Sequence, residues 1–255
     1  MLSETQLKQY REEGYVILED VFAPEEMDAL AARIDRFDEA CNAALVRSRS
    51  EYSNQIPNEI VFSCYLNFKD AEIQKFTADE RFVRLSTQLL GPDVRLYWDQ
   101  SVYKRPEARR DFPWHQDNGY VPIVPEHYLT CWLALNDATV ENGCIWVLPR
   151  SHLNGVVEHE QTPIGLQCYF GADPGLPVPL RKGSLVAFCS MLMHRSGPNH
   201  SAGVRKAYVI QYSVEGAYNP ATGAVFNNGP LIAKAGRPAY AGFVSHPEHS
   251  NALVG

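Results

Sequence analysis

Two potential metal ligands, His115 and Asp117, lie two residues apart in the run PWHQD, and a second histidine, His194, follows far along the chain. On a β-strand, residues i and i+2 project from the same face, so His115 and Asp117 are expected side by side. Two imidazoles and one carboxylate occupy neighbouring positions of a metal and leave others open, which is typical of non-haem Fe(II) oxygenases. A His-x-Asp pair occurs often by chance, and it is the distant His194, followed by Arg205, that favours a metal site.

The sequence around His194 predicts how the third ligand reaches the other two. A Gly183 turn leads into an apolar strand, which delivers His194 to a break at Gly-Pro-Asn. The β-rich run 205–213 is predicted to be a returning strand. A hairpin of this kind would bring Arg205 back beside Ser196 and His194. Arginine suits a buried carboxylate, because its planar guanidinium makes two parallel charge-assisted hydrogen bonds.

Further stretches of the chain carry a family resemblance. They are GYVIL (residues 14–18), VFAPEE (21–26), TCWLALNDA (130–138), ENG (141–143) and PRSH (149–152). With the metal ligands, they resemble the phytanoyl-CoA dioxygenase family of Fe(II)- and 2-oxoglutarate-dependent oxygenases over nearly the whole chain. The family commonly has a glycine where Arg150 stands, which changes a turn and not the chemistry. Asp117 is present, so the loss of the carboxylate ligand that is known from halogenases is not seen.

The resemblance implies a role for each site residue. His115, Asp117 and His194 would bind Fe(II), and Arg205 with Ser196 would hold the distal carboxylate of 2-oxoglutarate. Two further cosubstrate contacts are implied, at Trp132 and at a polar residue of the strand before His115, for which Gln100 is the candidate. No catalytic residue is expected beyond the metal ligands.

The implied activity is that of a dioxygenase that hydroxylates a small molecule, using O₂ and releasing succinate and CO₂. Desaturation, cyclisation or epimerisation would need the same ligands and stay open. A rival hypothesis is a non-oxidative cupin-type metal-binding protein, with Zn²⁺ as a candidate metal for the same triad. Arg205 with Ser196 argues against this rival, because a simple metal binder needs no buried guanidinium. A third reading, a phosphate- or sugar-binding jelly roll, ignores the triad.

The elements that must position these residues can be read from the sequence. Helices are expected from Ser3, with Gln6 completing a capping box, to Gly14, then from Pro24 to about residue 45, and over 78–90. Residues 15–18 are expected to form a first strand. From residue 94 onward, short β-rich segments predict an antiparallel sandwich or barrel. The resemblance implies a double-stranded β-helix, or cupin-like jelly roll, with helices outside. We expect one domain over residues 1–255, with a helical elaboration (1–92), a jelly-roll core (93–215) and a C-terminal extension (216–255).

Composition limits the class of partner. The net charge of −7 and pI near 5.6 argue against nucleic acid and against an anionic membrane. The sequence shows neither an apolar run that could span a bilayer nor a charged-then-apolar leader. The six cysteines contain no CxxC pair, which favours reduced core residues and a cytoplasmic protein. We expect a monomer or homodimer that acts on a small-molecule substrate.

The sequence also offers candidates for the substrate site. A basic segment, residues 104–111, directly precedes the metal strand and is a candidate clamp for an anionic substrate. The polar segment 47–58 is a candidate lid, and at least one of the two segments is expected to be poorly ordered before substrate binds. The full set of candidate substrate contacts is Asn67, Lys104, Arg109, Arg110, Trp114, Asn118 and Tyr120.

Overall fold

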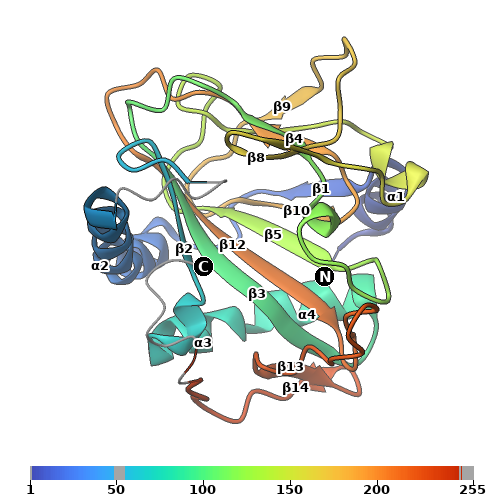
Figure 1. The fold of residues 1–255 in the computed structure, drawn as a ribbon. Coiled ribbons are helices and arrows are strands. Elements are labelled where there is room, and N and C mark those ends of the chain that lie inside the picture. The colour runs from blue at the N-terminus through green and yellow to red at the C-terminus, as the bar shows by residue number, and fades with distance from the viewer. Residues whose placement is uncertain (1, 49–54, 247, 249–255) are drawn as a thin grey trace.

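The computed structural model describes residues 2–48, 55–246 and 248. Two antiparallel sheets face each other, and the helices cover the outer face of the larger sheet (Figure 1). The larger sheet has the order β1 (Tyr15–Leu18), β10 (Leu185–Cys189), β5 (Leu129–Ala134), β12 (Arg205–Val214), β3 (Val94–Lys104), β13 (Leu231–Lys234), β14 (Arg237–Pro238), with β2 (Ile60–Cys64) also paired to β3.

The smaller sheet has the order β4 (Phe112–His115), β11 (His194–Ser196), β6 (Ile145–Val147), β9 (Leu176–Val178). A separate hairpin consists of β7 (Glu160–Thr162) and β8 (Gly165–Gln167). Short 3₁₀ helices are η1 (Leu66–Phe68), η2 (Asp117–Gly119) and η3 (Ser151–Asn154). The predicted mainly β, jelly-roll fold is confirmed.

Side chains alternate between the two faces of the larger sheet, as the twofold period of a strand requires. On β5, Leu129, Cys131 and Leu133 pack in a core with the helices, whereas Trp132 and Ala134 pack in a second core between the sheets. On β12 the same alternation places on the inner face Arg205, Ala207, Val209 and Gln211. The inner face of this sheet therefore carries polar groups as well as apolar ones.

The helices on the outer face are α1 (Glu4–Glu13), α2 (Pro24–Ser48), α3 (Ala71–Thr77) and α4 (Glu80–Leu90). The predicted capping box of Ser3 and Gln6 is present, and Gly14 ends α1 with a left-handed backbone (φ 87°). The helix predicted over 78–90 begins later, at Glu80, because the Asp79 side chain caps it by accepting from the Arg81 amide. The preceding α3 was not predicted.

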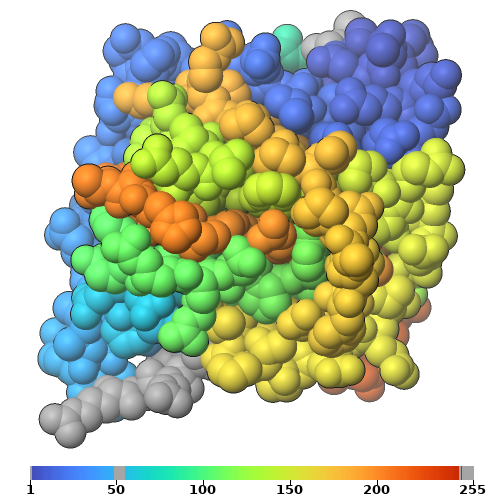
Figure 2. All heavy atoms as spheres, turned by 90° about the horizontal axis from the view of Figure 1, so that it is seen from above, coloured from blue at the N-terminus to red at the C-terminus, as the bar shows by residue number. Residues whose placement is uncertain are grey.

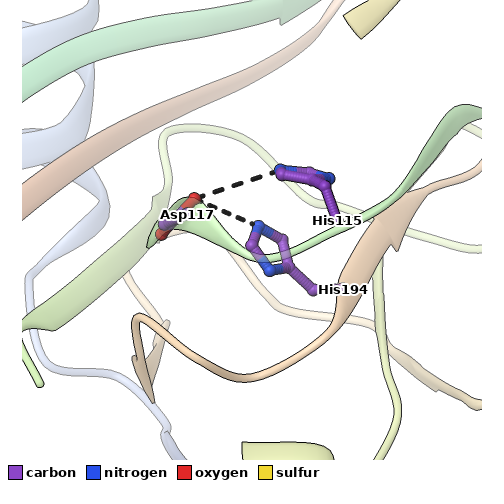
Figure 3. Close-up of side chains that lie close together, drawn as sticks. All are labelled: His115, Asp117 and His194. Carbon is purple, nitrogen blue, oxygen red and sulfur yellow. Dashed lines mark ion pairs between the residues drawn. The ribbon is translucent and has the colours of Figure 1, made fainter. Parts of the chain in front are cut away.

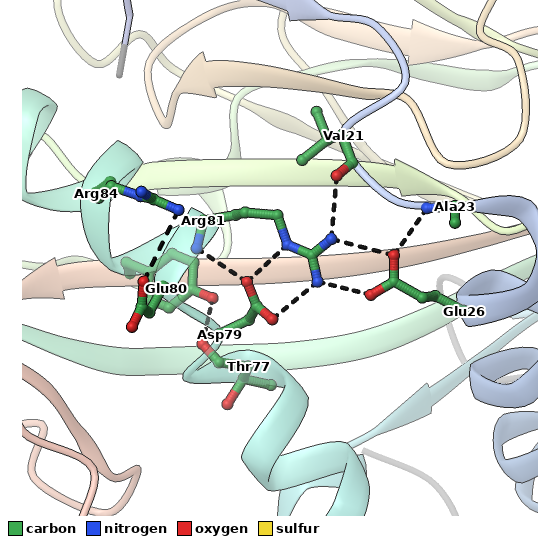
Figure 4. Close-up of polar contacts among 9 residues, drawn as sticks. Val21, Ala23, Glu26, Thr77, Asp79, Glu80, Arg81 and Arg84 are labelled. Carbon is green, nitrogen blue, oxygen red and sulfur yellow. Dashed lines mark hydrogen bonds and ion pairs between the residues drawn. The ribbon is translucent and has the colours of Figure 1, made fainter.

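Arg81 ties α4 to the segment that leads into α2 (Figure 4). Its guanidinium contacts the carboxylates of Glu26 and Asp79, each at 2.7 Å, and donates to the Val21 carbonyl at 3.2 Å. It also lies 3.9 Å from the centre of the Phe22 ring. One side chain therefore connects two helices that are far apart in the sequence.

We expect Arg81→Ala to lower the free energy of unfolding by about 1–2 kcal/mol, because it removes two charge-assisted contacts that are partly screened by solvent. Urea denaturation measures the difference. Arg84→Ala is the matched control, since Arg84 makes a single exposed ion pair with Glu80 at 3.9 Å, and it should change stability by less than about 0.5 kcal/mol. Equal effects of the two variants would contradict the bridging role of Arg81.

All six cysteines are free, and five of them are buried, as predicted for core residues. Among the described residues, no helix combines the length and the apolar character needed to cross a membrane. Half of the predicted lid segment 47–58, residues 49–54, lies outside the described part of the chain, and its first two residues, Arg47 and Ser48, belong to α2.

Candidate metal centre

Three short elements bring the predicted metal ligands together. His115 is the last residue of β4, His194 is the first residue of β11, and the two are register partners across the smaller sheet. Asp117 was predicted to lie on the same strand as His115, but it begins η2 instead. The ladder stops at Gln116 because its amide donates to Nε2 of His159 instead of a neighbouring strand. Gln116 keeps an extended backbone (φ −105°, ψ 143°), so His115 and Asp117 still project to the same side.

The ligand atoms of the three residues all lie within 4.8 Å of one another. Oδ1 of Asp117 is 3.5 Å from Nε2 of His194 and 3.9 Å from Nε2 of His115 (Figure 3). Both histidines are buried, with 7% of each residue exposed. A buried cluster of this composition and spacing could hold a metal ion.

Both imidazoles are oriented as metal ligands. Nδ1 of His115 donates to the Pro113 carbonyl at 2.8 Å, and Nδ1 of His194 donates to the Leu192 carbonyl at 2.9 Å. With Nδ1 protonated, each Nε2 has a free lone pair on the side of Asp117. Burial lowers the pKa of His115 to about 3 and that of His194 to about 4, so both rings are neutral near pH 7.

Asp117 is oriented by two side chains that sequence analysis missed. Its Oδ2 accepts from the Thr130 hydroxyl at 2.6 Å and from Nε2 of Gln211 at 2.9 Å, which leaves Oδ1 facing the histidines. Burial raises the pKa of Asp117, while these two hydrogen bonds act in the opposite direction. A bound cation would favour the ionised form. Strand alternation in the sequence could have identified these two residues. It places Thr130 on the same inner face as Trp132, and Gln211 on the same inner face as Arg205.

The predicted hairpin between His194 and Arg205 is wrong. Strand β11 pairs with β4 and β6 in the smaller sheet, whereas β12 pairs with β3 and β5 in the larger one. The connecting turn crosses between sheets instead of reversing within one. Arg205 nevertheless reaches the metal centre, because it projects from the opposite sheet into the same cavity as Ser196 and His194.

Arg205 is fully buried and only partly satisfied. Its Nη1 donates to the Val102 carbonyl at 2.9 Å, but Nε and Nη2 have no partner among the described residues. Its guanidinium lies 5.1 Å from the centre of the Trp132 ring, and burial lowers its pKa to about 10. Unpaired donors on a buried charge fit a carboxylate ligand, which would satisfy both.

A buried lysine lies beside the cavity of Arg205, and burial, followed by the charge of Arg205, lowers its pKa well below the usual value. Lys104, the register partner of Arg205, is buried and donates to the Ser196 hydroxyl at 3.0 Å. The Ser196 hydroxyl therefore accepts from lysine and can donate its own hydrogen into the cavity. The residues that line the cavity include the metal ligands, Arg205, Ser196, Trp132 and Gln100.

A larger cavity of 310 Å³ meets the first one at the metal ligands. The two cavities share the wall residues Phe62, Gln100, Phe112, His115 and Asp117. Tyr120, predicted as a substrate contact, also lines the larger cavity, and its ring meets that of His115 edge to face at 5.6 Å. The metal centre therefore separates a basic cavity from a larger aromatic one.

Other predicted substrate residues are engaged elsewhere. The Asn67 amide donates to the buried Asp99 carboxylate at 2.5 Å, and the Asn118 amide donates to the Glu126 carbonyl at 2.8 Å. Trp114 packs edge to face against Tyr169. None of these three predicted residues lines either cavity at the metal ligands.

The predicted anionic clamp is contradicted by the position of its arginines. Arg109 and Arg110 are exposed, and Arg109 donates to the Asn199 carbonyl at 3.4 Å. Their segment (green) lies beside the loop between β11 and β12 (orange) on the outer surface (Figure 2). Neither arginine lines a cavity at the metal ligands.

Comparison with known proteins gives consistent matches. The family model described as phytanoyl-CoA dioxygenase matches residues 10–207. Phytanoyl-CoA dioxygenase domain-containing protein 1 of Mus musculus is 25% identical, over 82% of this chain and 89% of the mouse protein. The crystal structure of the epimerase SnoN, in complex with Fe³⁺ and alpha-ketoglutarate, has a TM-score of 0.74 at 22% identity and covers 90% of this chain and 98% of SnoN. That of the carbocyclase SnoK has a TM-score of 0.72 at 24% identity, over 91% and 97%.

Proposed function

Because the chain belongs to the phytanoyl-CoA dioxygenase family, whose members are 2-oxoglutarate-dependent non-haem iron oxygenases, we propose that it hydroxylates a small-molecule substrate with release of succinate and CO₂. The observation that carries the proposal is the buried triad of His115, Asp117 and His194 next to the unsatisfied guanidinium of Arg205. A cupin-type metal-binding protein without oxidative activity would have no use for Arg205.

Each site residue then has a task. His115, Asp117 and His194 hold the iron, with Thr130 and Gln211 orienting the carboxylate. Arg205 and Ser196 hold the distal carboxylate of 2-oxoglutarate, beside the Trp132 ring, and Gln100 lies where the two cavities meet. When bound, iron and 2-oxoglutarate supply the oxidising power, since O₂-dependent decarboxylation to succinate is coupled to oxidation of a substrate C–H bond.

The protein contributes geometry and exclusion of water. The ligands come from rigid positions in and beside the smaller sheet, and Arg205 comes from the larger sheet. The cosubstrate would be held between them, and the aromatic cavity meets this site at the metal ligands His115 and Asp117. A different oxidative outcome, epimerisation or cyclisation, is the second candidate, because the similar structures SnoN and SnoK are an epimerase and a carbocyclase.

Reconstitution tests the activity. Metal-free protein supplied with Fe(II), 2-oxoglutarate and O₂ is expected to release succinate, and removal of iron by a chelator should stop this release. Adding Fe(II) back should restore it, whereas Zn²⁺ should not, because Zn²⁺ has no redox chemistry. Mass spectrometry of reaction mixtures with candidate substrates then separates hydroxylation, a gain of one oxygen atom, from epimerisation, in which the mass is unchanged. A protein that binds metal without consuming 2-oxoglutarate would contradict the proposal.

A further inference from the structure

The 310 Å³ cavity has an aromatic wall and almost no charge. Among the described residues that line it, His115 and Asp117 are the only ones of the types Asp, Glu, His, Lys or Arg, and both belong to the metal centre. The volume of this cavity is at the lower end of the range for small-molecule sites. A charged group of a substrate would lose its hydration there without gaining a counter-ion. The aromatic residues of the wall are Phe62, Tyr97, Trp98, Phe112, Tyr120 and Tyr128.

Two of these residues, Tyr97 and Tyr128, form a rigid pair. Their ring centres are 5.0 Å apart, and the Tyr97 ring also meets that of Phe226 edge to face at 5.0 Å. Tyr128 belongs to a small core with Ile123 and Ala217, against which Tyr97 packs. Because both rings are held from several sides, the positions of their hydroxyl groups are set by the fold.

The hydroxyl groups of this pair make no hydrogen bond with any described residue. Other tyrosine hydroxyls of the larger sheet are paired: Tyr103 donates to Asp35 at 2.8 Å, Tyr208 to Asp99 at 2.7 Å and Tyr212 to the Thr77 carbonyl at 2.6 Å. A phenol that is mostly removed from solvent normally has such a partner. Burial, and after it the charge of Asp117, raises the pKa of Tyr97 and Tyr128, so both stay protonated and can donate.

We propose that the substrate is an uncharged molecule with a flat ring and an oxygen acceptor, and that the hydroxyl groups of Tyr97 and Tyr128 donate to this oxygen. The ring would pack against the aromatic wall, and the paired phenols would fix which carbon faces the metal centre. This inference rests on the proposed function, because it places the substrate in the cavity opposite Arg205. It replaces the anionic substrate that the basic segment 104–111 had suggested.

Three ring compounds of similar size serve as probes for this cavity. 2-Acetylnaphthalene is neutral and has one oxygen acceptor, 2-ethylnaphthalene lacks the acceptor, and naphthalene-2-sulfonate is an anion. Their dissociation constants are measured by equilibrium dialysis with the protein loaded with Fe(II) and 2-oxoglutarate without O₂. Binding of 2-oxoglutarate is measured first, since its failure would contradict the proposed function itself and not only the substrate class.

We expect 2-acetylnaphthalene to bind at least about tenfold more tightly than the sulfonate, which would be buried without a counter-ion. Tyr97→Phe and Tyr128→Phe keep the rings and should each weaken 2-acetylnaphthalene about three- to tenfold, while binding of 2-ethylnaphthalene is unchanged. Tyr218→Phe, at an exposed position outside the cavity, should alter neither. Equal binding of the sulfonate would overturn the uncharged substrate, and Phe variants that bind the ketone like the parent protein would overturn the role of the phenols.

Discussion

Replacing His194 with alanine is expected to abolish iron binding at stoichiometric metal and to reduce 2-oxoglutarate turnover more than 100-fold. Loss of residues that merely orient a ligand typically costs ~10–100-fold in metal affinity or activity, and removal of a ligand itself should cost more. Nε2 of His194 lies 3.5 Å from Oδ1 of Asp117, and Nδ1 is already bonded to the Leu192 carbonyl, so His194 is held for coordination. Metal content after dialysis and succinate release are the two measurements.

The matched control for this variant is His200→Ala. His200 is an exposed histidine outside the metal centre, so its replacement should leave iron content and turnover unchanged. His194→Ala protein that keeps one iron per chain and full turnover would remove His194 from the ligand set. A folded His194→Ala protein that has lost only iron would support it, because the small residue leaves the backbone pairing of β11 with β4 possible.

The metal ligands could be predicted because their signal is local. His115 and Asp117 are two residues apart, and a single extended residue between them is enough to align their side chains. The strand assignment of Asp117 failed for a non-local reason, since His159 takes the amide hydrogen of Gln116. The capping box of α1 and the first strand were also predicted correctly, because each depends on residues that are close together in the sequence.

The parts that were missed depend on contacts between distant segments. Arg205 was correctly expected near Ser196, but by a hairpin, whereas the real route crosses between two sheets. Thr130 and Gln211 become partners of Asp117 only after β5 and β12 pair. A charge run such as 104–111 shows no periodicity that separates an outer surface from a pocket wall, so its arginines could not be placed from the sequence.

Replacing Arg205 with lysine is expected to raise the KM for 2-oxoglutarate more than tenfold while leaving iron binding intact. The guanidinium has two donors, Nε and Nη2, without partners among the described residues, and a carboxylate can accept from both at once. Lysine keeps the charge but not the planar pair of donors. Loss of a buried charge-assisted partner typically costs ~2–5 kcal/mol, and about 1.4 kcal/mol corresponds to a factor of ten.

The control for Arg205→Lys makes the same chemical change elsewhere. Arg109→Lys alters an exposed arginine that lines neither cavity at the metal ligands, so the KM for 2-oxoglutarate should stay at the value of the parent protein. Iron content measured on both variants separates loss of cosubstrate affinity from damage to the triad.

An unchanged KM in Arg205→Lys would mean that the distal carboxylate is held by another group. The other basic side chains beside this cavity are Arg195, which lines it, and Lys104, which donates to the Ser196 hydroxyl. Loss of affinity in Lys104→Met but not in Arg205→Lys would identify Lys104 as that group.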